Sequence, residues 1–217
     1  MKVVNVDFPE KNYYQEKHTK NQIVLHHTVS NPKSQVGDIE HWNSLSGRIA
    51  TYAIIGYDGI IYECFDPSFW AHHIGLTTRT LMNLGYEDYR RRNLILNKHS
   101  IAIEIDSWGA LTKKNNNKYH SIYNTPIDKD LEVDEVEFRG YKHFQKYSKA
   151  QIETLGLLLP KLMKEFNIKN EGIKDGNFDV RHDAIEGDSG IFSHTSYRSD
   201  KSDIYPNKEL INLLRNI

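Results

Sequence analysis

Cysteine is almost absent from the sequence, because Cys64 is the only one among 217 residues. A single cysteine cannot form an internal disulfide, which excludes a small secreted scaffold held by disulfides and fits synthesis in a reducing compartment. We expect Cys64 to be a small buried residue. Net charge is also nearly absent, since 28 Lys and Arg residues balance 29 Asp and Glu residues. Affinity for nucleic-acid phosphates needs clustered basic side chains, so we expect no nucleic-acid partner.

Long apolar segments are missing as well. No stretch reaches the roughly 20 apolar residues of a membrane-spanning helix, and we expect no stable membrane insertion. The opening residues, MKVVNVDFPEKNYYQEK, reach acidic side chains after a few apolar ones and lack the apolar run and cleavage site of a signal peptide. We therefore expect a protein that is cytoplasmic on synthesis. Its length suffices for one compact domain over residues 1–217, stable as a monomer.

Short runs of β-branched and aromatic residues, bounded by turn residues, predict the strands. They cover residues 23–28, 51–56, 60–65, 101–106 and 178–181. Asp58-Gly59 lies between the second and third of these runs and predicts a tight hairpin. Antiparallel pairing is therefore expected at that point.

Helical periodicity is clearest over residues 149–166, where Ser148 and Gln151 form a capping box. Two further helices are predicted at residues 36–45 and 208–215. Strands interleaved with helices predict an α/β fold, with a central mixed β-sheet flanked by helices.

Two segments interrupt this pattern, near residues 77–99 and 110–147. Polar and charged residues dominate both of them. We interpret them as surface insertions in a single domain.

Histidine is abundant, with eleven in the chain, and some of these residues occur in informative places. His26 and His27 end the first predicted strand, where successive side chains point to opposite faces, so only one of them can enter a given site. His194 begins a polar segment that also contains Lys201 and Asp203. A loop of this length can fold back so that His194 and Asp203 meet a third ligand from a distant strand. Two imidazoles and one carboxylate leave an open position on a tetrahedral zinc ion, which is typical of a catalytic site.

Five segments, in this order, resemble the zinc-dependent N-acetylmuramoyl-L-alanine amidases. That fold is shared by phage endolysin amidases, bacterial cell-wall recycling amidases and peptidoglycan recognition proteins. The segments are residues 23–28 (IVLHHT), 52–59 (YAIIGYDG), 70–75 (WAHHIG), 100–104 (SIAIE) and 194–203 (HTSYRSDKSD). Each is weak alone, and their common order over most of the chain carries the resemblance.

The resemblance implies a zinc cofactor held by His26, His194 and Asp203, with aspartate where other members carry cysteine. Lys201, two positions before the third ligand, matches the lysine that stabilises the developing oxyanion. His182 is an alternative for the second ligand, because recognition-protein relatives place theirs in a comparable context. The Lys-x-Asp that follows His194 favours His194.

Two residues are candidates for the general base, because branches of the family use either the tyrosine of the hairpin, here Tyr52, or a glutamate in the central strand, here Glu104. A carboxylate beside zinc-bound water can take its proton and deliver it to the leaving amine, whereas a phenol with a pKa of about 10 is a poor base near neutrality. An acidic residue within Ile-Ala-Ile-Glu-Ile is also costly to bury without a partner. We therefore favour Glu104.

Aromatic residues and a further histidine are candidates for substrate binding. His73 matches the family's histidine in the segment that lines the substrate groove, and Trp70 lies in the same segment. An equal alternative for His73 is a role in orienting a loop or a ligand. Trp42, Trp70 and Trp108 either stack on sugar faces or fill the core.

The resemblance therefore implies zinc-dependent hydrolysis of the amide between N-acetylmuramic acid and L-alanine in peptidoglycan. A phage or prophage endolysin, acting on the cell wall after release, is the expected setting, and a bacterial recycling amidase is an alternative. A non-catalytic peptidoglycan-binding module and a zinc hydrolase acting on another amide remain open. Binding modules of this fold lose a zinc ligand, whereas all three candidate ligands are present here, which favours an enzyme.

Overall fold

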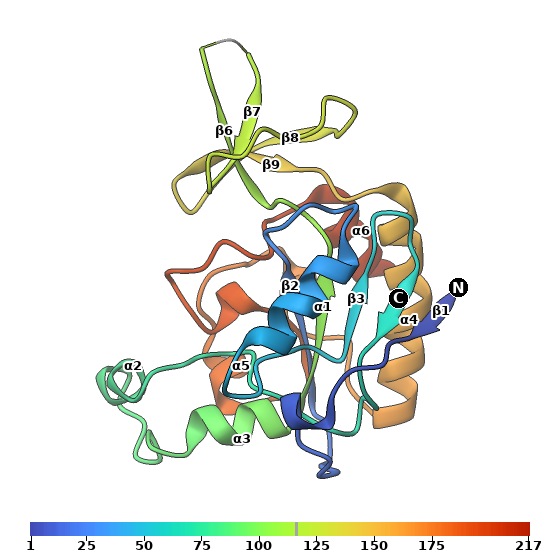
Figure 1. Ribbon diagram of the computed structural model, residues 1–217. Coiled ribbons are helices and arrows are strands. Elements are labelled where there is room, and N and C mark those ends of the chain that lie inside the picture. Colours follow the sequence, from blue (N-terminus) through green and yellow to red (C-terminus); the bar gives the residue numbers. More distant parts are fainter. Residues whose placement is uncertain (116) are drawn as a thin grey trace.

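The computed structural model describes residues 1–115 and 117–217, which form two β-sheets with helices packed around the larger one (Figure 1). The central sheet has the strand order β1-β4-β3-β5-β2-β10. Its strands are β1 (Val3–Asn5), β2 (Gln22–His27), β3 (Ala53–Ile55), β4 (Ile61–Glu63), β5 (Ser100–Ile105) and β10 (Gly190–Ser193). β3 and β4 pair antiparallel through the predicted hairpin, and the other pairings in this sheet are parallel. The predicted α/β fold with a mixed central sheet is confirmed.

The predicted helices are also present. The α-helices are α1 (Gln35–Ser44), α2 (Thr78–Asn83), α3 (Arg92–Lys98), α4 (Lys149–Phe166), α5 (His182–Glu186) and α6 (Lys208–Asn216). Short 3-10 helices occupy Glu10–Asn12, Ile173–Asp175 and His194–Ser196. α4 begins with the predicted capping box, because the Ser148 side chain accepts from the Gln151 N–H and the Gln151 side chain accepts from the Ser148 N–H. Over the described part of the chain, no helix combines the length and apolar character needed to cross a membrane.

The two faces of the central sheet differ in what covers them. Leu25 of β2 points to the face that packs against α4 and α6. Its neighbour Val24 points to the opposite face and packs with residues of α3 and α5. His26 shares the face of Val24 because side chains alternate along a strand. On this face Ile54 of β3, which lies opposite Glu104 of β5 in the register, packs in a cluster with α1.

A second sheet lies between β5 and α4 in the chain and projects from one end of the central sheet (Figure 1). Its strands, in the order β7-β6-β9-β8, are antiparallel: β6 (Ala110–Lys113), β7 (Tyr119–Ser121), β8 (Val133–Phe138) and β9 (Tyr141–Gln145). The sequence pattern did not predict these strands. Polar residues interrupt their apolar ones, and β8 has half-buried and exposed positions only.

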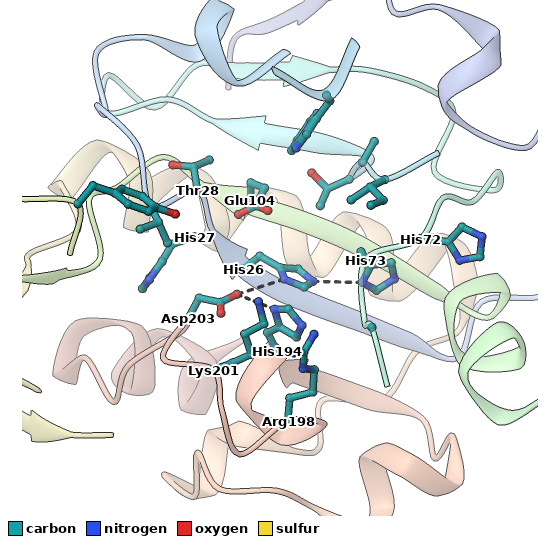
Figure 2. A pocket seen from close by; sticks show the side chains of 17 residues that line it. His26, His27, Thr28, His72, His73, Glu104, His194, Arg198, Lys201 and Asp203 are labelled. Carbon is teal, nitrogen blue, oxygen red and sulfur yellow. Dashed lines mark hydrogen bonds and ion pairs between the residues drawn. The ribbon is translucent and has the colours of Figure 1, made fainter. Parts of the chain in front are cut away.

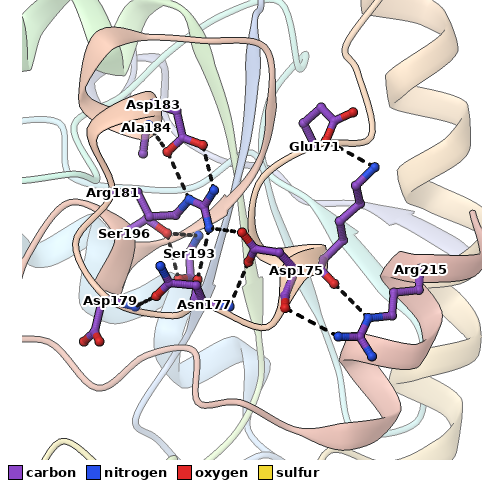
Figure 3. Close-up of polar contacts among 11 residues, drawn as sticks. Glu171, Asp175, Asn177, Asp179, Arg181, Asp183, Ala184, Ser193, Ser196 and Arg215 are labelled. Carbon is purple, nitrogen blue, oxygen red and sulfur yellow. Dashed lines mark hydrogen bonds and ion pairs between the residues drawn. The ribbon is translucent and has the colours of Figure 1, made fainter.

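The predicted strand at residues 178–181 is wrong, and the central sheet contains two strands that were not predicted, β1 and β10. Side chains near this segment bind the local backbone instead (Figure 3): the Asp175 carboxylate accepts the N–H of Asn177 at 2.8 Å, and the Asn177 side chain accepts that of Asp179 at 3.0 Å. Arg181 donates to Asp175 at 2.7 Å. Local bonds of this kind compete with a strand ladder, so the segment turns rather than pairs.

Candidate metal centre

Three side chains that could hold a metal ion converge at the carboxyl end of β2 (Figure 2). His26 lies in β2, His194 begins the 3-10 helix that follows β10, and Asp203 lies in the next loop. One potential ligand atom from each lies within 4.8 Å of the others. Asp203 Oδ2 is 3.3 Å from His26 Nδ1 and 2.9 Å from His194 Nδ1. The parallel pairing of β10 with β2 brings these distant parts of the sequence together.

In His194 and His26, the ring nitrogen that points away from Asp203 makes a hydrogen bond, and this bond indicates which nitrogen carries the proton. His194 Nε2 donates to the backbone carbonyl of Ile74 at 2.8 Å, so Nδ1 of the neutral ring carries a lone pair. Ser100 Oγ donates to a backbone carbonyl of α3 at 2.7 Å and accepts from His73 Nε2 at 2.8 Å. His73 Nδ1 then accepts from His26 Nε2 at 3.1 Å, which turns the Nδ1 lone pair of His26 toward Asp203. Two lone pairs and a carboxylate therefore face one another, an arrangement that a bound cation would stabilise.

The protonation states favour the same arrangement. Burial, with a contribution from His194, lowers the pKa of His26 to about 4. Burial and the two neighbouring imidazoles hold the pKa of His73 well below its ordinary value. Burial raises the pKa of Asp203, but where no metal is bound a proton on the facing Nδ1 of His194 or His26 takes the place of the cation, and these interactions hold the pKa of the Asp203 carboxyl well below its ordinary value. Neutral histidine and ionised aspartate are the forms in which these side chains bind metals.

A pocket of about 440 Å³ contains this group, and Glu104 and Lys201 also line it. Glu104 lies opposite His26 in the register of β5 and β2. Its Oε2 is buried and has no hydrogen-bond partner within residues 1–115 and 117–217. Burial, followed by the charge of Asp203, raises the pKa of Glu104 well above its ordinary value. A buried carboxyl with a raised pKa, in a pocket beside potential metal ligands, has the properties of a general base.

The structure places Tyr52, the alternative base, outside this pocket. Its hydroxyl donates to Glu63, and its ring belongs to the core cluster that includes α4. Burial, together with Glu63, raises the pKa of Tyr52, which makes the phenol a still weaker acid. Thr51 lines the pocket instead. β3 begins at Ala53, so the side-chain alternation that places Ile54 on the face of Glu104 does not extend back to Tyr52.

His182 and Trp70 also lie away from the pocket. The His182 side chain is 79% exposed and interacts with Glu186 on α5. Trp70 is buried, and its ring stacks on Tyr14 with the centroids 3.8 Å apart. Cys64 is a buried free thiol, as expected.

The pocket includes residues that were assigned from the sequence and others that were not. His73 is in the pocket, where it contacts His26, and Trp42 lines it as well. Tyr123 and Arg198 line it without having been predicted. Arg198 lies within the matched segment 194–203, where its charge was a usable signal. Tyr123 lies in a polar insertion, and no periodicity in that segment marks it.

Comparison with known proteins agrees with this geometry. A family model described as N-acetylmuramoyl-L-alanine amidase matches residues 16–206. The fold is similar to the amidase LysC from Clostridium intestinale URNW, at 16% identity and a TM-score of 0.51 over 100% of this chain and 99% of that chain. A mutant form of PlyL gives 10% identity and a TM-score of 0.52 over 100% of both chains. No curated protein matches the sequence.

The solved structures share the fold at low identity, whereas the family model reports on the sequence itself. Its match extends over most of the chain and includes His26, Glu104, His194 and Asp203. The chain therefore belongs to the N-acetylmuramoyl-L-alanine amidase family.

Proposed function

We propose that this protein hydrolyses the amide bond between N-acetylmuramic acid and L-alanine in peptidoglycan, with a zinc ion held by His26, His194 and Asp203, as an endolysin of phage or prophage origin. The observation that carries the proposal is the convergence of two imidazole Nδ1 lone pairs on the Asp203 carboxylate, with Glu104 in the same pocket. Family membership supports the choice of bond.

The donor set fits zinc. Two neutral imidazoles and one carboxylate are the three protein ligands typical of a catalytic zinc site with an open fourth position. Each histidine is fixed from its far side by a hydrogen bond, His194 by the carbonyl of Ile74 and His26 by His73. Such contacts orient ligating imidazoles and raise their basicity. His73 is thus a positioning residue in this proposal.

Each group at the site then has its own role in the reaction. Zinc at this site would act as a Lewis acid and lower the pKa of bound water toward about 7. Glu104 takes the proton of the attacking water on its carboxylate and delivers it to the nitrogen of the leaving L-alanine. Lys201, which lines the pocket, stabilises the negative charge that develops on the scissile carbonyl oxygen.

The proposal is tested by the release of stem peptide from purified peptidoglycan, followed as new amino termini. We expect release to stop after treatment with a chelator and to return with added zinc. Asp203→Ala should lose both bound zinc, measured by atomic absorption, and peptide release. Asp188→Ala, a matched change at an exposed aspartate, should lose neither.

Other outcomes identify the competing functions. Binding to peptidoglycan without cleavage in any metal would make the protein a recognition module and overturn the proposal. Zinc-dependent cleavage of a different amide in purified muropeptides would keep the metal site and overturn the bond assignment. Lysis of whole cells by added protein would support the endolysin role.

A further inference from the structure

The second sheet leaves the central sheet beside the metal centre, at the end of the pocket marked by His27. Gly109, directly before β6, has a φ of +63°, and a Cβ there would lie 2.2 Å from His27 Nε2. After β9, Tyr147 places its hydroxyl 3.1 Å from His27 Nδ1. Both connections to the sheet therefore contact His27, which lines the pocket.

Ion pairs and hydrogen bonds fix the same sheet to loops on two sides of the pocket. Lys33, between β2 and α1, lies 2.9 Å from Asp128 and 3.1 Å from Asp130 in the connection between β7 and β8. Arg139, in the turn between β8 and β9, donates to the carbonyl of Ser199 at 2.9 Å. Ser199 belongs to the loop that also carries the third ligand candidate. The second sheet is thus attached to both the α1 side and the ligand loop.

The turn after β7 places an aromatic side chain at the pocket. Tyr123 lines the pocket, yet its exposed fraction is 71%. The turn is closed by bonds between Ser121 N–H and the Thr125 carbonyl at 2.8 Å and between Asn124 N–H and the Ser121 carbonyl at 2.9 Å. A ring held in a closed turn with its surface open to solvent is available to a ligand.

The two ends of the pocket differ in chemistry. At the end away from His27 lie His72 and the guanidinium of Arg198 (Figure 2), whose Nη1 is close to Gly75. Nε and Nη2 of this guanidinium bind Asp200, at 3.0 and 2.6 Å, and its Nη1 suits a carboxylate of a stem peptide. The end reached by the second sheet presents the phenol ring of Tyr123, whose apolar face and polar tip suit the C–H face and hydroxyls of a sugar.

We infer that the second sheet forms the sugar-binding wall of the pocket, with Tyr123 stacking on a pyranose ring of the glycan strand. This inference rests on the proposed function, because it takes the substrate to be a glycan strand that bears peptides. Tyr123 is then a specificity-determining residue: it binds the sugar side of the substrate and does not take part in proton transfer.

Glycan binding is measured by calorimetry with peptide-free glycan strands and the Glu104→Gln protein, so that hydrolysis plays no part. We expect Tyr123→Ala to weaken binding about tenfold, and Tyr123→Phe or Tyr123→Trp to keep most of it. Ile122→Ala is the matched control, because Ile122 lies in the same turn and is 43% exposed. In the active protein, Tyr123→Ala should raise KM for peptidoglycan by a similar factor and leave kcat within about twofold.

The results separate this inference from the proposed function. Aromatic-dependent glycan binding by a protein that cleaves no amide would support the wall and overturn the proposed reaction. Unchanged glycan binding in Tyr123→Ala, with hydrolysis intact in the parent protein, would overturn the wall alone. Loss of affinity for a free stem peptide instead of the glycan would assign Tyr123 to the peptide side and also overturn the inference.

Discussion

The central sheet and the second sheet contribute to the same pocket in different ways. The central sheet supplies His26 and Glu104 from adjacent parallel strands, buried and fixed in register. The second sheet supplies Tyr123 from an exposed turn and is attached through Gly109 and surface ion pairs such as Lys33–Asp128. The proposed general base and one proposed metal ligand thus lie on strands, the other two proposed ligands lie in the segment after β10, and the proposed sugar contact lies on the projecting sheet.

The largest expected effect lies at His194, the proposed ligand in the 3-10 helix after β10. His194→Ala removes an imidazole that faces Asp203 and should lower peptide release by about 10³-fold or more, with loss of bound zinc. His182→Ala is the control, because this histidine has a 79% exposed side chain on α5. The two variants are compared in one assay of release rate and zinc content. Equal activity of His194→Ala and the parent protein would contradict the metal centre.

Much of the central region could be predicted from the sequence because its signals are local. Apolar runs mark β2 and β5, whereas the choice of His26 over His27 came from the family resemblance, and both residues line the pocket. The capping box at Ser148 fixes the start of α4. The position of Tyr52 was not predictable to the same accuracy: the predicted strand covers residues 51–56, whereas β3 begins at Ala53, and alternation does not hold before that residue.

The second sheet could not be predicted because its stability does not come from a long apolar run. Polar side chains, such as Asp134 with Tyr205 at 2.8 Å, and isolated apolar ones, such as Phe144 in the main core cluster, attach it to the domain. Such contacts join residues far apart in the chain and leave no periodic pattern. The strand predicted at residues 178–181 is wrong for a different reason. An apolar pattern is present there, but side chains bind the local backbone, and the segment does not pair with another strand.

The next effect concerns proton transfer in the central region. Glu104→Gln keeps the size of the side chain and removes its basicity, so kcat should fall by about 10²- to 10⁴-fold. Zinc content and glycan binding should remain, because Glu104 is not among the three converging ligand atoms. Steady-state kinetics alongside metal analysis tests this. Tyr52→Phe should retain most activity, and a loss as large as that of Glu104→Gln would contradict the assignment.

A smaller effect is expected where the two sheets join. In Gly109→Ala the new Cβ would lie 2.2 Å from His27 Nε2 at a φ of +63°, and we expect a loss of about 3 kcal/mol in the free energy of unfolding. Gly140→Ala is a matched control, since its φ is +82° but no atom lies within 4 Å of the new Cβ. Backbone strain alone should cost it about 1 kcal/mol. Urea denaturation of both variants measures the difference, and equal losses would show that the contact with His27 does not constrain the junction.

The smallest effect is a dependence of stability on pH at Asp106, which follows β5. Burial, with a contribution from Asp38, raises the pKa of Asp106 from its ordinary value of 3.8 to about 7. Between these values the folded protein binds more protons at this carboxyl than the unfolded chain does, so its contribution to stability is present below about pH 4 and is lost as the pH rises toward 7.

Asp106→Asn removes this titration and should flatten the fall in the free energy of unfolding over that window, by on the order of 1–3 kcal/mol. Part of the dependence of the free energy of unfolding on pH should remain in this variant, because burial also raises the pKa of Asp38, to about 6. Urea titrations of parent and variant at a series of pH values test this, and parallel curves would show that the Asp106 carboxyl is already ionised in the folded protein throughout the range, held by its bonds from Gln35 and Thr28.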